Sequence, residues 1–189
     1  MRVMPEVASE QRVADGLSES LDLFLWSLPG LLLWSALALF ISGRVSAFLE
    51  TKRWIAFLLL VNLGLIVALT LSPTTLAVDG AVASSGTCDL SRVLPLAPGE
   101  LVQDFDAVVN ILLFTSIGFL LALLPLTQRN RIVVASAFLL TFGIELVQLL
   151  LPAIGRGCES ADMVDNTLGL LIGLAVGYGF MAVATRVRP

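Results

Sequence analysis

The chain has 189 residues, of which 57% are hydrophobic and 14% are charged, and its formal net charge is −4. A mean hydropathy of +0.94 excludes an ordinary soluble domain, because so few polar residues cannot cover so much apolar surface. The negative net charge does not favour nucleic-acid binding, because that function needs a basic surface. The sequence therefore predicts an all-α protein that crosses a membrane several times.

Five apolar runs are long enough to span a hydrocarbon core of about 30 Å, which takes roughly 20 helical residues. They predict a single transmembrane domain at 21–184, preceded by an acidic external tail at 1–20 and followed by a short cytoplasmic tail at 185–189. In an alternative with four spans, the first run is a cleaved signal sequence, but that run is long and follows an acidic segment. The expected spans are 21–43, 54–71, 107–126, 132–151 and 164–184.

The basic residues fall on one side of a five-span chain, and this asymmetry predicts its orientation. Short loops rich in Lys and Arg stay on the cytoplasmic side. The N-terminus and the two acidic loops are therefore expected outside, and the C-terminus in the cytoplasm. The residues that carry this argument are Arg44, Lys52, Arg53, Arg129, Arg131, Arg186 and Arg188.

The first external loop, from Ser72 to about Asp106, is unusually long and rich in turn-forming residues. It contains Cys88, and Cys158 lies in the second external loop. On the oxidising side of a membrane this pair favours a disulfide, which would close about 70 residues and stabilise the fold by on the order of 4 kcal/mol. Two unpaired thiols are the alternative. No metal site is expected, because two cysteines without any histidine provide too few ligands.

The last three spans each carry a polar pair near the expected external end. The members of a pair are three or four residues apart, which places them on one face of a helix. Ionisable groups at such depth suggest a functional site. Asn62, midway along the second span, is instead expected to hydrogen-bond a neighbouring helix. The pairs are Asp106 with Asn110, Glu145 with Gln148, and Asp162 with Asn166.

A glycine series in the fifth span, Gly169, Gly173 and Gly177, predicts close approach to another helix. Such packing would gather the polar pairs in one pocket open to the outer leaflet, joined by Arg156 and Glu159 from the adjacent loop. The alternative is that these polar groups only hydrogen-bond helices to one another. Because the glycine face could pack within one chain or between two, a homo-oligomer or a membrane partner stays open.

Three motifs, in this order, resemble the VanZ-like family of bacterial membrane proteins over about residues 104–178. They are N-I-L-L-F-x-x-x-G-F at 110–119, E-L-V-Q at 145–148 and R-x-x-E-x-x-D-x-x-x-N-T-L-G at 156–169. The chain departs from the family pattern at Glu159, where an Asp is expected, and at Thr115 and Ser116, where Ile-Pro is common. The resemblance implies an envelope protein in the bacterial cytoplasmic membrane. A founding member of the family is associated with low-level resistance to the glycopeptide teicoplanin.

The resemblance implies no reaction, so three functions stay open. The favoured one is binding or handling of an envelope lipid, a lipid-linked precursor, a glycolipid or a lipoglycopeptide in the acidic outer pocket. The second is a membrane enzyme for lipid-linked substrates, with Glu145 and Asp162 as an acid–base pair, although no histidine and no nucleophile motif accompany them. The third is a small ion-coupled carrier, for which five spans lack the usual inverted repeat. No cofactor is expected.

Overall fold

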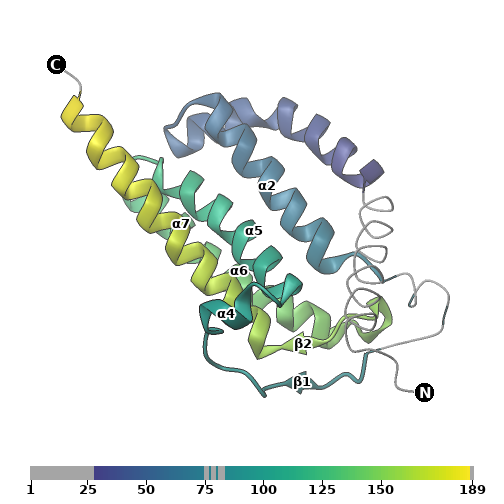
Figure 1. Cartoon of the computed structure of the whole chain (residues 1–189). Coiled ribbons are helices and arrows are strands. Elements are labelled where there is room, and N and C mark those ends of the chain that lie inside the picture. Colours follow the sequence, from purple (N-terminus) through teal and green to yellow (C-terminus); the bar gives the residue numbers. More distant parts are fainter. Residues whose placement is uncertain (1–27, 75–76, 78–79, 81–83, 188–189) are drawn as a thin grey trace, which may run out of the picture.

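The structure is a computed structural model that describes residues 28–74, 77, 80 and 84–187. Five helices in this part of the chain are long and apolar enough to cross a membrane, and they form one bundle (Figure 1). The predicted all-α, multi-pass architecture is confirmed, and the direction of crossing stays a prediction. The five helices are Leu28–Leu49, α2 (Arg53–Leu71), α5 (Phe105–Ala122), α6 (Gln128–Leu150) and α7 (Ser160–Val187).

Short elements gather at one end of the bundle, formed by the described residues of the connections 72–104 and 151–159, which we call the loop end (Figure 1). Two strands there, β1 (Cys88–Asp89) and β2 (Cys158–Glu159), pair in parallel with the two cysteines opposite each other. A disulfide joins these cysteines across 70 residues of chain. The short helix α4 (Pro98–Leu101) precedes α5, and the 3-10 turn η1 (Pro152–Ile154) follows α6.

Several helix boundaries differ from the predicted ones, because polar caps and not apolar runs decide where a helix begins. The predicted tail at 1–20 and the start of the first span lie outside the described residues. The first helix continues to Leu49, so Arg44 is helical and does not lie in the connection. Thr127 starts α6 earlier than predicted, since its hydroxyl accepts a hydrogen bond from the backbone nitrogen of Asn130 (3.2 Å). At the C-terminal end, α7 continues to Val187, into the predicted tail.

The glycine series of α7 faces α5. A Cβ atom added at any of the three glycines would overlap atoms of α5. The hydroxyl of Thr115 in α5 also donates to a carbonyl oxygen of α7 (3.1 Å). These two helices make the most extensive contact of any pair of elements in the described chain. Close backbone approach therefore brings α5 and α7 together within one chain, as small residues allow in membranes. The three positions are Gly169, Gly173 and Gly177.

The other helices join this pair through apolar packing and single hydrogen bonds. Asn62 of α2 donates to the hydroxyl of Ser116 in α5 (2.5 Å), so the expected interhelical bond is confirmed. The helix Leu28–Leu49 is the least buried span, and its Trp34 donates to the carbonyl oxygen of Leu60 in α2 (2.6 Å). The largest fully buried apolar side chains are Ile66, Phe114, Ile144 and Leu170.

The short connections 50–52 and 123–127 lie opposite the loop end, and we call this the basic end. There the Asn130 amide nitrogen donates to the carbonyl oxygens of Leu49 (3.0 Å) and Pro125 (2.9 Å). Arg53 donates to the carbonyl oxygen of Leu39 (2.9 Å). The bundle therefore carries basic residues near one end, among them Lys52, Arg53, Arg129 and Arg131, and acidic loops at the other. This is the asymmetry from which its orientation was predicted.

Candidate functional site

A cavity of about 420 Å³ opens at the loop end. The last turn of α2, the first turns of α5, the end of α6 and the segment that leads into α7 form its wall. Polar and apolar side chains share this wall, as in pockets that receive one face of an amphipathic molecule. The lining residues are Leu69, Thr70, Thr74, Phe105, Asp106, Val109, Asn110, Leu113, Gln148, Gly155, Arg156, Gly157, Glu159 and Asp162.

The structure brings most of the sequence-predicted polar residues together in this wall. Glu145 and Asn166 are the exceptions, since both are buried, each 1% exposed, behind the lining. Three helices and one loop, far apart in sequence, thus supply a common polar surface. The predicted residues in the lining are Asp106, Asn110, Gln148, Arg156, Glu159 and Asp162.

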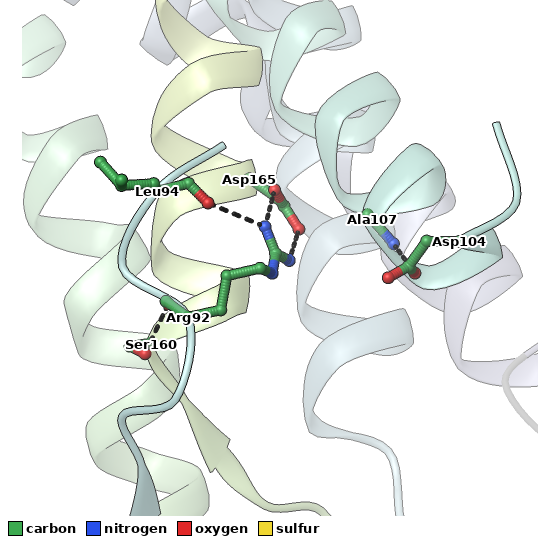
Figure 2. Close-up of polar contacts among 6 residues, drawn as sticks. All are labelled: Arg92, Leu94, Asp104, Ala107, Ser160 and Asp165. Atoms are coloured by element: carbon green, nitrogen blue, oxygen red, sulfur yellow. Dashed lines mark hydrogen bonds and ion pairs between the residues drawn. The ribbon is translucent and has the colours of Figure 1, made fainter. Parts of the chain in front are cut away.

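The N-terminal turn of α5 places Asp106 at the cavity. Asp104 caps this helix, because its carboxylate accepts a hydrogen bond from the backbone nitrogen of Ala107 (3.0 Å; Figure 2). Asp106 then lies in the first turn, where the helix dipole favours a negative charge. Asn110 follows one turn later and lines the same cavity.

The end of α6 supplies one residue to the wall and one behind it. The Gln148 amide nitrogen donates to the carbonyl oxygen of Thr70 (2.9 Å), which ties α6 to α2. Glu145 instead accepts a hydrogen bond at Oε2 from the backbone nitrogen of Glu159 (2.8 Å). Glu145 therefore positions the strand that carries Glu159. Over the described residues, the remaining oxygens, Gln148 Oε1 and Glu145 Oε1, have no hydrogen-bond partner.

The loop after α6 is fastened to the end of α2. The backbone nitrogen of Thr74 donates to the carbonyl oxygen of Ile154 (3.0 Å), and Arg156 Nε donates to that of Ser72 (3.1 Å). Gly155 has a φ of 71°, and a Cβ there would lie 2.7 Å from the Cβ of Ala77. Only glycine fits this left-handed turn without strain, which brings Arg156 back toward the cavity.

A second attachment holds the long loop against α7. Arg92 forms a two-pronged ion pair with Asp165, through Nη1 to Oδ1 (3.0 Å) and Nη2 to Oδ2 (2.5 Å; Figure 2). The Ser160 hydroxyl donates to the carbonyl oxygen of Arg92 (2.7 Å). Asp165 is fully buried, and its hydrogen bond raises the pKa of Arg92. Together with the disulfide, this pair fixes the segment 88–94 beside the start of α7.

Sequence reasoning missed the pairing of Arg92 with Asp165. The two residues are 73 positions apart, and no helical or strand periodicity relates them. One signal was present, because a carboxylate inside an apolar helix requires a cation or a set of donors.

The carboxylates of the loop end influence one another. Burial raises the pKa of Glu159, and the negative charges of Asp89 and Asp106 raise it further. The pKa of Asp89 is lowered, because its carboxylate accepts a hydrogen bond from the backbone nitrogen of Ser91. The loop end is therefore a region of negative potential. Within the described residues, no group of three or more His, Cys, Asp or Glu side chains is placed to hold a metal ion.

Comparison with known proteins gives a family but no individual relative. No curated protein and no solved structure matches the chain. A family model described as VanZ/LLP1 matches residues 31–181, which extends from the first described helix to α7 and well beyond the motifs at 104–178. The chain therefore belongs to the VanZ-like family.

Proposed function

We propose that this protein binds an envelope lipid, a glycolipid or a lipoglycopeptide, with the polar part of the ligand in the cavity of the loop end. The site would face the outer leaflet of the bacterial cytoplasmic membrane. The observation that carries the proposal is the cavity itself, a hollow of about 420 Å³ with polar and apolar walls, at the end of helices whose outer surfaces are apolar.

The composition of the wall supports an amphipathic ligand. Leu69, Phe105 and Leu113 offer apolar contact, while Asp106 and Asp162 offer charge. The volume lies within the range of about 300–1,000 Å³ that is common for ligand pockets. Membership in a family linked to glycopeptide resistance agrees with a ligand from the cell envelope.

The acid–base alternative receives less support from the geometry. It requires both Glu145 and Asp162 to reach the substrate. Asp162 lines the cavity, but Glu145 lies behind the wall, where one of its oxygens holds the backbone of Glu159. Glu145 is therefore better described as a residue that shapes the site.

Native mass spectrometry of the protein extracted gently from its own membrane tests the proposal. We expect a specific retained lipid, which Asp162→Asn loses because this change removes one charge from the wall. Glu100→Gln is the matched control, since it removes an exposed carboxylate of α4 outside the cavity lining. Bulk phospholipid only, unchanged by Asp162→Asn, would contradict the proposal. Turnover of a bound lipid-linked molecule would instead support an enzyme.

A further inference from the structure

The second half of the long loop exposes apolar side chains, although a loop in water usually exposes polar ones. Five large apolar residues of the segment 90–105 are each between 58% and 78% exposed. Single exposed apolar residues are common on protein surfaces, but a group of them within one short segment indicates an interaction surface. The five residues are Leu90, Val93, Leu94, Val102 and Phe105.

The contact between α5 and α7 shows which parts of the two helices lie at the same level. Both helices begin at the loop end (Figure 1). A Cβ atom added at Gly169 would overlap the backbone of Ile111, and one added at Gly173 would overlap the backbone of Thr115. Each of these contacts joins residues that are 58 positions apart. With the same offset, Asp165 lies level with the first turn of α5.

The ion pair between Arg92 and Asp165 brings the loop to this level. The Arg92 guanidinium also donates to the carbonyl oxygen of Leu94 (3.5 Å; Figure 2), so this part of the loop lies beside the second turn of α7 and not beyond its end. The hydrogen bond with Asp165, and after it the charge of Asp104 at the start of α5, raise the pKa of Arg92, which agrees with this placement. Val93 and Leu94 are therefore level with the start of α5.

The length of α5 places this level at the membrane surface. The helix has 18 residues and is about 27 Å long at 1.5 Å per residue. A hydrocarbon core is about 30 Å thick, and head groups extend the bilayer to about 40–45 Å. Because α5 has no length to spare, its first turn lies near the edge of the hydrocarbon core. Phe105 in that turn and Leu112 further along the helix are both exposed, so the apolar outer surface of α5 reaches this edge.

From this placement we infer that the segment 90–105 lies against the bilayer at the loop end, with its five exposed apolar side chains inserted between lipid head groups. The partner is the membrane leaflet, because these side chains continue the apolar outer surface of the spanning helices at the same level. The exposed carboxylates of Asp89 and Glu100 would remain among the head groups. The expectation of a loop that lies wholly outside the membrane is thereby revised for this segment. The inference does not depend on the ligand of the cavity.

Spin labels on the full-length protein test the inference. The two cysteines of the chain form the disulfide, so one added cysteine provides the only free thiol of the oxidised protein. Leu94→Cys and Val102→Cys each receive a nitroxide label. The protein is reconstituted at one chain per nanodisc in phosphatidylethanolamine and phosphatidylglycerol. Electron paramagnetic resonance then measures collisions of the label with oxygen, which concentrates in lipid, and with a nickel chelate, which stays in water.

Two control positions calibrate the measurement. Leu112→Cys provides a label on the apolar outer surface of α5, and Ser85→Cys provides one in the polar, exposed part of the same loop. We expect the ratio of oxygen to nickel collisions at Leu94 and Val102 to be higher than at Ser85 and to approach the ratio at Leu112. Val102 lies outside the disulfide and the ion pair, so its variant tests the inference even if Leu94→Cys disturbs the loop.

Three outcomes would overturn the inference. A ratio like that of Ser85 at both positions would show that the segment lies in water. Few collisions with either reagent in nanodiscs with one chain would show that the chain itself buries these residues. Protection that appears only when several chains share a nanodisc would assign the surface to a second copy of the protein. None of these results would affect the proposed ligand of the cavity, which the retained lipid and its loss in Asp162→Asn test separately.

Discussion

The two ends of the helix bundle use polar side chains in different ways. At the basic end, Arg53 and Asn130 donate to backbone carbonyl oxygens of neighbouring helix ends. The cavity found there measures only about 120 Å³, and no carboxylate lines it. These polar groups mainly connect helices.

At the loop end, structural contacts surround a larger cavity. The disulfide, the Arg92–Asp165 pair and the bond from Glu145 to the backbone of Glu159 hold the loops in place. Inside these attachments, the carboxylates of Asp106, Glu159 and Asp162 line the cavity. The difference suggests two roles for polar groups near the helix ends. Side chains that donate to backbone carbonyl oxygens hold helices together, whereas side chains that line a cavity are available to bind a ligand.

The largest expected effect comes from removing the disulfide of the loop end. Cys88→Ser with Cys158→Ser should lower the free energy of unfolding by roughly 4 kcal/mol, because the disulfide closes a long loop in the unfolded chain. Denaturant unfolding in detergent measures this, with the reduced wild type as the matching sample. The basic end contains no cysteine, so hydrogen exchange of the amides there that open locally, and not by global unfolding, should be unchanged. An unfolding free energy within about 0.5 kcal/mol of the oxidised wild type would contradict a stabilising role.

A pair of arginine substitutions compares the two ends directly. Arg92→Met should cost roughly 3 kcal/mol, because it leaves the carboxylate of Asp165, which is 1% exposed, without its cation. Arg53→Met should cost less than about 1 kcal/mol, since Arg53 is exposed, as is Leu39, whose carbonyl oxygen it contacts.

The double variant Arg92→Met, Asp165→Asn provides the control for this comparison. Removing both charges should recover part of the loss, because no buried charge is then unpaired. Equal costs for Arg92→Met and Arg53→Met would show that the two ends do not differ in this respect.

Much of the fold could be predicted from composition and spacing alone. Five apolar runs of sufficient length determine five helices, since only helices satisfy the backbone in lipid. The spacing of Gly169, Gly173 and Gly177 indicated a close helix contact, and α5 provides it. The starts of α5 and α7 were placed too late, because their first turns are polar and an apolar window omits them.

The candidate site was predicted only in part, and the reason is physical. Helical spacing places Asp106 and Asn110 on one face, and the cavity shows both. Helical spacing does not predict that Glu145 accepts a hydrogen bond from a backbone nitrogen 14 residues away, or that Arg92 pairs with Asp165. Those contacts depend on how loops return to the bundle, which no local periodicity encodes.

The smallest expected effect is a pH dependence confined to the loop end. Burial and the charges of Asp89 and Asp106 raise the pKa of Glu159 above its ordinary 4.5, so the folded protein holds this proton more firmly than the unfolded chain. Its contribution to stability is therefore complete below the ordinary pKa and is lost as the pH rises through the raised pKa. Glu159→Gln removes this loss, so the variant should gain stability relative to the wild type as the pH rises above the ordinary pKa of 4.5.

Asp89→Asn supplies the opposite sign. The pKa of Asp89 is lowered by the hydrogen bond from Ser91, so its contribution is present above the ordinary pKa and is lost as the pH falls through the lowered one. Thermal unfolding across the pH range should therefore give opposite slopes for the two variants relative to the wild type. The arginines of the basic end stay charged throughout this range. Equal slopes in both variants would mean that the groups responsible for the pH dependence are neither Glu159 nor Asp89, and would contradict the prediction that the loop end is the pH-sensitive end.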